Sequence, residues 1–278
     1  MDVNSKQNRQ SNIELLRIFA TLFVIAHHFA IYSGFEFYSK AISFNKLWIQ
    51  FIKMSGGIGI DVFVLISGYF LISKKEVNTN KIVKLWTQIF FYSTFIYIAF
   101  VFFKAIPFEI KEFVKNLLPI SFSKWWFAST YFLLYLLSPY INSMIKSLDK
   151  KCFIEFLLIF GLLWCVIPTF TGILFQSNNL IWFAYLYCLG AYIRLYNPIV
   201  NKSMKSFFLI LIMIITAIAI LLIVLDYCEF LISDFEIGNY FLFSKQSFSV
   251  LIISVLLLIC FSKSQIKYTL TCQTNFRF

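Results

Sequence analysis

Charged side chains are scarce in this chain. Asp, Glu, Lys and Arg make up 13% of its 278 residues, whereas 60% are hydrophobic and the mean hydropathy is +0.80. This composition excludes a soluble domain, because a surface that faces water needs more charge. A membrane β-barrel is excluded as well, since its strands would alternate polar and apolar residues, which the Phe- and Ile-rich runs do not. The sequence predicts an all-α, polytopic transmembrane helix bundle.

Metal-binding patterns are also missing. The chain has two histidines, His27 and His28, and adjacent positions on one helix cannot supply two opposed axial ligands to a haem. The six cysteines lie mostly within or beside apolar runs, without metal-ligand or paired spacing, and we interpret them as packing residues. The chain also lacks internal repeats, which argues against a transporter built from inverted repeats. We therefore predict no metal site.

Apolar runs long enough to cross a bilayer recur along the chain. We predict a single integral-membrane domain over residues 1–278 with about eight spans. The second span is short, and Met54 is an alternative start for it. Residues 262–278 are predicted to form a non-spanning tail, which resembles the end of a chain cut short. The predicted spans are 13–31, 58–72, 82–103, 126–145, 152–174, 180–196, 207–225 and 248–261.

The distribution of basic residues predicts the orientation of these spans. Lysines and arginines concentrate in the N-terminal segment and in alternate loops, whereas the loop after residue 225 is acidic. Cytoplasmic loops carry the excess of basic residues, so both termini are predicted to be cytoplasmic. The net charge of +11 is thus explained by topology, and we predict no nucleic-acid partner.

The first span contains ionisable residues, which are costly in a membrane and mark a candidate functional site. Arg17 and His28 are eleven residues apart, so they share one stripe of the helix, separated by a rise of about 16 Å. Glu14 lies a rise of about 21 Å from His28, too far for a catalytic dyad. Glu14 and Arg17 either mark the inner interface or serve the site. We interpret His28 as a general base or nucleophile and His27 as a structural residue.

The second span brings a carboxylate into the same outer part of the bilayer as His28. Asp61 is predicted either to orient the imidazole of His28 or to cap the start of a helix. Before it, Gly56, Gly57 and Gly59 are expected to form an anion-binding turn or simply to bend a loop. After it, Ser67 and Gly68 are expected to let two helices approach closely.

Three segments in the first half of the chain match a known family in order. Arg17, ten further residues and His28 resemble the first-span signature of the membrane-bound acyltransferase 3 family, in which Glu14 falls at a usually acidic position. The letters GIDVFVLISGY at residues 59–69 resemble its second-span motif. Residues 125–139 resemble its tryptophan-phenylalanine segment, which ends in Ser138-Pro139.

This resemblance implies an enzyme that moves an acyl group, usually acetyl, from cytoplasmic acetyl-CoA to a hydroxyl of a cell-surface polysaccharide or another envelope glycan. It makes Arg17 and His28 the essential pair, with Arg17 holding the phosphates of the donor. Lys81 and Lys84 stand where the family often has arginines, and they would bind phosphate as point charges. The expected catalytic residues are therefore His28, Arg17 and Asp61, and the expected donor-binding residues are Arg17, Lys81 and Lys84.

The expected partners are an acyl-CoA donor, a glycan or glycolipid acceptor and the lipids of a bacterial plasma membrane. Two alternatives remain open from the sequence. A lipid or polysaccharide exporter would need polar residues in several spans, and few occur beyond the second. The family usually has about ten spans, so a truncated and inactive remnant of the acyltransferase is the other alternative.

Overall fold

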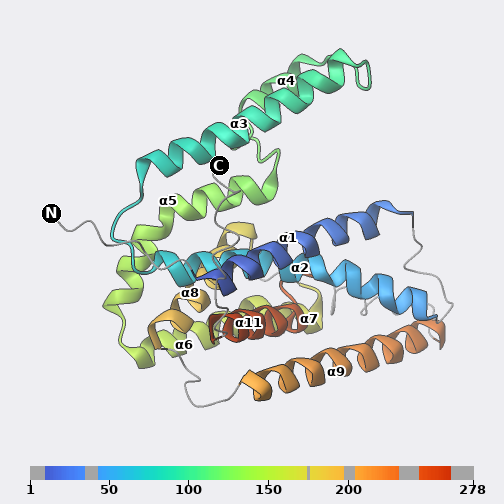
Figure 1. Ribbon diagram of the computed structural model, residues 1–278, viewed down its shortest axis with the longest axis vertical. Coiled ribbons are helices and arrows are strands. Elements are labelled where there is room, and N and C mark those ends of the chain that lie inside the picture. Colours follow the sequence, from blue (N-terminus) through green and yellow to red (C-terminus); the bar gives the residue numbers. More distant parts are fainter. Residues whose placement is uncertain (1–9, 35–42, 174–175, 197–203, 232–243, 264–278) are drawn as a thin grey trace, which may run out of the picture. The chain divides into compact units, whose positions relative to one another are not determined.

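The computed structural model describes residues 10–34, 43–173, 176–196, 204–231 and 244–263. Within these ranges every regular element is a helix, which confirms the predicted all-α fold (Figure 1). The chain divides into two compact units. Unit 1 consists of Met1–Ile66, Gly161–Phe175 and Leu195–Phe278, and unit 2 of Ser67–Phe160 and Gln176–Arg194. The single domain stays a prediction, and residues 264–278 of the predicted tail lie outside the described residues.

Each predicted span overlaps one or more helices of the described residues. In the described residues, four helical segments are long and apolar enough to cross a membrane: Ser11–Tyr32, Phe44–Leu71, Thr79–Phe102 and Lys150–Thr171. The full count of about eight spans stays a prediction. The helices are α1 (Ser11–Tyr32), α2 (Phe44–Leu71), α3 (Thr79–Phe102), α4 (Ile110–Leu117), α5 (Trp126–Ser147), α6 (Lys150–Gly161), α7 (Ile167–Thr171), α8 (Asn179–Tyr196), α9 (Met204–Leu231) and α11 (Phe248–Lys263).

The predicted start of the second span is wrong. Helix α2 begins at Phe44, where the Ser43 hydroxyl accepts a hydrogen bond from the Lys46 backbone N–H at 3.1 Å, as an N-cap residue does. Lys46 and Gln50 are buried, although polar residues at these positions suggested a loop. The short helix α4 was not predicted, because eight residues between two spans carry little periodic signal.

The predicted fifth span is interrupted rather than uniform. A π-helical turn, η1 (Leu162–Val166), connects α6 to α7 just before Pro168, a residue that has no N–H to donate to the helix. The Thr169 hydroxyl donates to the Cys165 carbonyl at 2.6 Å and accepts the Phe248 N–H at 2.9 Å, so it links η1 to the start of α11. The helix ends at Thr171, because Gly172 adopts the left-handed conformation (φ 72°).

In unit 1, α1 packs on α2 through glycines. A Cβ atom at Gly59 would lie 2.6 Å from the Ala20 carbonyl oxygen, and one at Gly56 would collide with the His27 ring. These glycines lie in the middle of α2, so both predicted roles, an anion-binding turn and a bent loop, are wrong. They instead allow close helix packing. Helix α11 contacts α1 and α9, and the Asn12 amide donates to the Phe261 carbonyl.

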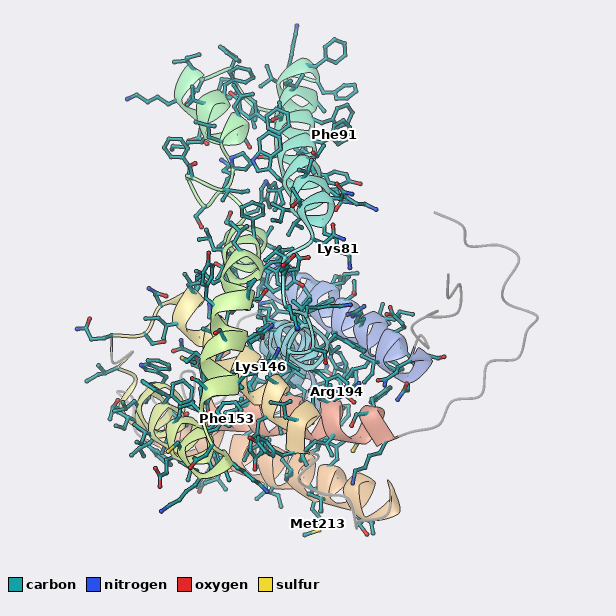
Figure 2. The ribbon with its side chains drawn as sticks, turned by 90° about the vertical axis from the view of Figure 1, so that its left-hand side faces the viewer. Lys81, Phe91, Lys146, Phe153, Arg194 and Met213 are labelled. Carbon is teal, nitrogen blue, oxygen red and sulfur yellow. The ribbon has the colours of Figure 1, made fainter. Side chains whose placement is uncertain are left out.

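In unit 2, the end of α2 packs on α8. A Cβ atom at Gly68 would collide with the carbonyl of Tyr187, and the Ser67 hydroxyl lies 3.1 Å from the Tyr131 hydroxyl. This confirms the predicted close approach at Ser67 and Gly68. Helices α3 and α4 lie side by side (Figure 1), and aromatic side chains, Phe91 among them, project along α3 (Figure 2).

Asn142 connects three helices of unit 2. Its buried amide nitrogen donates to the carbonyls of Leu71 at 2.8 Å and Lys74 at 3.0 Å, where α2 ends. Its amide oxygen accepts the hydroxyl of Tyr187 in α8, also at 2.8 Å. The Asn142 side chain of α5 therefore donates to two carbonyls at and just after the end of α2. It also orients the buried Tyr187.

We expect Asn142→Leu to lower the free energy of unfolding by about 2–4 kcal/mol, because it removes the donor to the Leu71 and Lys74 carbonyls and the acceptor of the buried Tyr187 hydroxyl. Asn142→Asp should lose nearly as much, since a carboxylate cannot donate to carbonyls. The control is Asn80→Leu, an exposed position in α3, which should change the value by less than about 0.5 kcal/mol. The measurement is detergent-titrated unfolding of the purified protein. Equal effects of Asn142→Leu and Asn80→Leu would contradict this role.

Candidate functional site

The polar stripe of α1 carries the residues that the sequence singled out. Because α1 is one uninterrupted helix, the spacing of Arg17 and His28 places both on the same face. The Arg17 guanidinium donates to the Glu14 carboxylate at 2.8 Å, and the side chains of both residues are more than 30% exposed. Arg17 therefore keeps part of its five-donor surface accessible to a ligand while Glu14 holds its orientation.

His28 is exposed and has a defined tautomer. Its Nδ1 lies 2.7 Å from the Val24 carbonyl oxygen, one turn earlier in α1. A carbonyl only accepts, so Nδ1 carries the hydrogen, and Nε2 of the neutral ring is the proton acceptor. The ring also stacks on Tyr32, with 6.2 Å between centroids. This arrangement leaves Nε2 available to accept a proton, as a general base does.

His27 occupies a different environment. Its Nδ1 lies 2.5 Å from the Lys53 carbonyl oxygen of α2, and its ring fills the space that Gly56 leaves open. It contacts His28 edge to face, with 5.4 Å between ring centroids. These contacts agree with the structural role that the sequence indicated for His27.

Asp61 is completely buried in α2. Its carboxylate acts electrostatically on the Cys165 thiol in η1 and on Lys245, which lies in the turn before α11. Among the described residues, His28 makes its contacts with Val24, His27 and Tyr32, and not with Asp61. The pairing of Asp61 with His28 stays a prediction, and it requires an arrangement other than this one.

A polar pocket of about 310 Å³ lies within unit 2, between the end of α2, the start of α3 and the middle of α5. Lys74 and Lys81 contribute two ammonium groups, and Lys81 stands at the start of α3 (Figure 2). Neutral polar residues beside the start of α3 and in α5 also line the pocket. The other lining residues are Leu71, Glu76, Val77, Asn78, Tyr135, Ser138, Pro139 and Asn142. Lys84 is exposed on α3 and does not line this pocket.

The sequence located only part of this pocket. The sequence singles out Lys81 and the Ser138-Pro139 pair, but it does not indicate Lys74, Tyr135 or Asn142 as site residues. One signal in the sequence could have located the pocket: Asn142 is a polar residue inside a predicted span, one turn after Pro139. Lys245 was also missed, because nothing in its local sequence relates it to Asp61.

The arrangement offers two chemical capabilities, each within one unit. Unit 1 presents an exposed imidazole with a proton-accepting Nε2 on the same helical stripe as a guanidinium. Unit 2 presents a pocket lined by two lysines, one glutamate and neutral polar residues, so a positive charge remains that can bind a phosphate-bearing ligand. Across the described residues, no cluster of three or more His, Cys, Asp or Glu side chains could hold a metal ion.

Comparison with known proteins identifies the family. A family model described as an acyltransferase domain, that of the acyltransferase 3 family, matches residues 10–271, which is most of the chain. Curated proteins and solved structures give no match. The family match and the four membrane-length helices agree with the resemblance seen in the first half of the sequence. The chain is an integral membrane protein and belongs to the acyltransferase 3 family.

Proposed function

We propose that this protein is a plasma-membrane O-acyltransferase of a bacterial cell. It moves an acetyl group from cytoplasmic acetyl-CoA to a hydroxyl of a cell-surface polysaccharide or another envelope glycan. Its N-terminus lies in the cytoplasm, as the basic loops indicate. The observation that carries the proposal is the exposed His28, whose Nδ1 bonds to the Val24 carbonyl and leaves Nε2 as the proton acceptor of the ring, in a chain of an acyltransferase family.

The donor phosphates are assigned to the pocket of unit 2. Lys74 and Lys81 supply positive charge, while the amide of Asn78 and the hydroxyl of Tyr135 provide neutral hydrogen-bond donors. Both lysines lie in or beside a loop that the positive-inside pattern places in the cytoplasm, where acetyl-CoA is found. Arg17, near the N-terminal end of α1, is a third cation on the side of the membrane that the basic loops indicate as cytoplasmic.

The proposed role of His28 is proton transfer at the acceptor hydroxyl. The hydroxyl oxygen attacks the thioester carbonyl carbon while its proton passes to Nε2 of His28. A carbon–oxygen bond forms, the carbon–sulfur bond breaks, and the departing thiolate of coenzyme A takes a proton from the imidazolium. The products are the acetyl ester and the free thiol, and the imidazole returns to its neutral form.

We expect Lys81→Gln to raise KM for acetyl-CoA by about tenfold or more with little change in kcat, because one charge-assisted phosphate contact is worth about 1.5–3 kcal/mol. The control is Lys75→Gln, which removes the same charge from an exposed position outside the pocket. Initial rates over a range of acetyl-CoA concentrations provide the test. A Lys81→Gln variant with the KM of Lys75→Gln would remove this lysine from the donor site.

The proposed reaction is tested by incubating membranes that contain the chain with acetyl-CoA labelled in the acetyl group, together with envelope glycan. We expect label on the glycan that mild alkali releases as acetate, the behaviour of an O-acetyl ester. Movement of glycan across the membrane without label would instead favour an exporter. If the folded protein neither transfers acetyl groups nor transports glycan, the result would favour an inactive remnant.

A further inference from the structure

Asp61 is a buried carboxylate whose negative charge has to be compensated within the protein. Its side chain is completely buried in α2, and one helical turn earlier on the same face lies Gly57. A carboxylate buried in this way costs several kcal/mol unless a positive charge or hydrogen bonds compensate it. The groups that pack on this face of α2 therefore decide how Asp61 is accommodated.

The turn before α11 packs on this face, within unit 1. A Cβ atom at Gly57 would lie 3.2 Å from the Cα of Lys245 and 3.2 Å from a methyl group of Val250. Further along α11, the Ser254 hydroxyl lies 3.4 Å from the Ile58 carbonyl oxygen. The lack of a side chain at Gly57 thus brings the backbone of Lys245 onto α2, one turn from the buried carboxylate.

The charges at this contact are complementary. Burial lowers the pKa of Lys245, and the Asp61 carboxylate opposes that effect by favouring the charged ammonium. On the other side of the turn, the Phe248 N–H donates to the Thr169 hydroxyl at 2.9 Å, which fixes the start of α11 against α7. The backbone on either side of the Lys245 side chain is therefore anchored, at Gly57 of α2 and at Thr169 of α7.

We propose that Asp61 and Lys245 form a buried ion pair that holds the turn before α11 on α2. This role goes beyond the proposed acyl transfer and does not depend on it. Removal of one partner leaves the other charge buried and alone, whereas removal of both leaves a neutral contact. The pair therefore predicts strong energetic coupling between two residues 184 positions apart in the sequence.

The test is a double-mutant cycle in the full chain, using Lys245→Met, Asp61→Asn and the double variant. The readout is the fraction of protein that stays monodisperse after heating in mild detergent. We expect each single variant to lose more than about half of this fraction, and the double variant to recover more than about half of the loss. Lys245→Arg should behave as the unchanged chain, and Lys75→Met, at an exposed position, serves as the control.

Two outcomes would overturn the ion pair. One is a Lys245→Met variant that is as stable as Lys75→Met, and the other is a double variant that is no more stable than the less stable of the two single variants. If the single variants cannot be produced in folded form, production of the double variant alone supports the pair, and its absence overturns it. Acyl transfer plays no part in this readout, so failure of the proposed function leaves the test unaffected.

Discussion

Replacement of His28 with Asn is expected to lower acyl transfer by about 10²–10⁴-fold, the range contributed by a positioned general base. The amide nitrogen of Asn can still donate to the Val24 carbonyl in place of Nδ1, so the fold of α1 should be kept. What the variant lacks is the basic Nε2. His28→Gln, which places an amide group near the position of Nε2, should be equally inactive because an amide is not a base.

The chain offers a matched control in the neighbouring histidine. His27→Asn also keeps a donor toward a carbonyl, that of Lys53, and it removes a ring that packs against Gly56. We expect this variant to lose some stability and to retain acyl transfer per folded molecule within about threefold, since His27 does not act on the substrate. If His27→Asn were inactive and His28→Asn active, the assignment of the base would be reversed.

The second large effect is expected at Gly68. Gly68→Val should lower the free energy of unfolding by about 3 kcal/mol or more, because the new side chain meets the backbone of α8 at Tyr187. Backbone cannot rotate away as a flexible side chain can, so the two helices must separate. Detergent-titrated unfolding measures the loss, and a reduced yield of monodisperse protein accompanies it.

The control for Gly68→Val is Ala217→Val, which adds bulk at an exposed position of α9. It should leave the free energy of unfolding within about 0.5 kcal/mol of the unchanged chain. A Gly68→Val variant as stable as Ala217→Val would mean that α2 and α8 do not approach at this glycine.

The helices could be predicted from the sequence because long apolar runs have few other structures in a membrane. The bounds of α1, α3 and α5 lie within a few residues of those predicted. The start of α2 was missed because Lys46, Gln50 and two adjacent glycines interrupt its apolar pattern. These residues lower the local hydropathy, so the segment resembles a loop. Ser43, three residues before Lys46, is nevertheless a suitable N-cap.

The contacts between helices could not be predicted in the same way. Gly59 and Gly68 have the same local signal, a small residue in an apolar run, yet one meets α1 and the other meets α8. The partners of Asn142 and Asp61 depend on which helices are neighbours, and periodicity carries no such information. The cost of ionisable groups in a membrane singled out Arg17 and His28, and the family resemblance implied that they are the essential pair. The tautomer of His28 required the position of the Val24 carbonyl.

The central claim is that this chain transfers an acetyl group from a donor on one side of a membrane to an acceptor on the other. The most direct measurement uses purified protein in sealed lipid vesicles, with labelled acetyl-CoA outside and acceptor glycan enclosed. The account predicts alkali-labile label on the enclosed glycan, at a rate that falls by about 10²-fold or more with His28→Asn. Unlabelled glycan in vesicles of folded protein, or equal labelling with the His28→Asn variant, would contradict it.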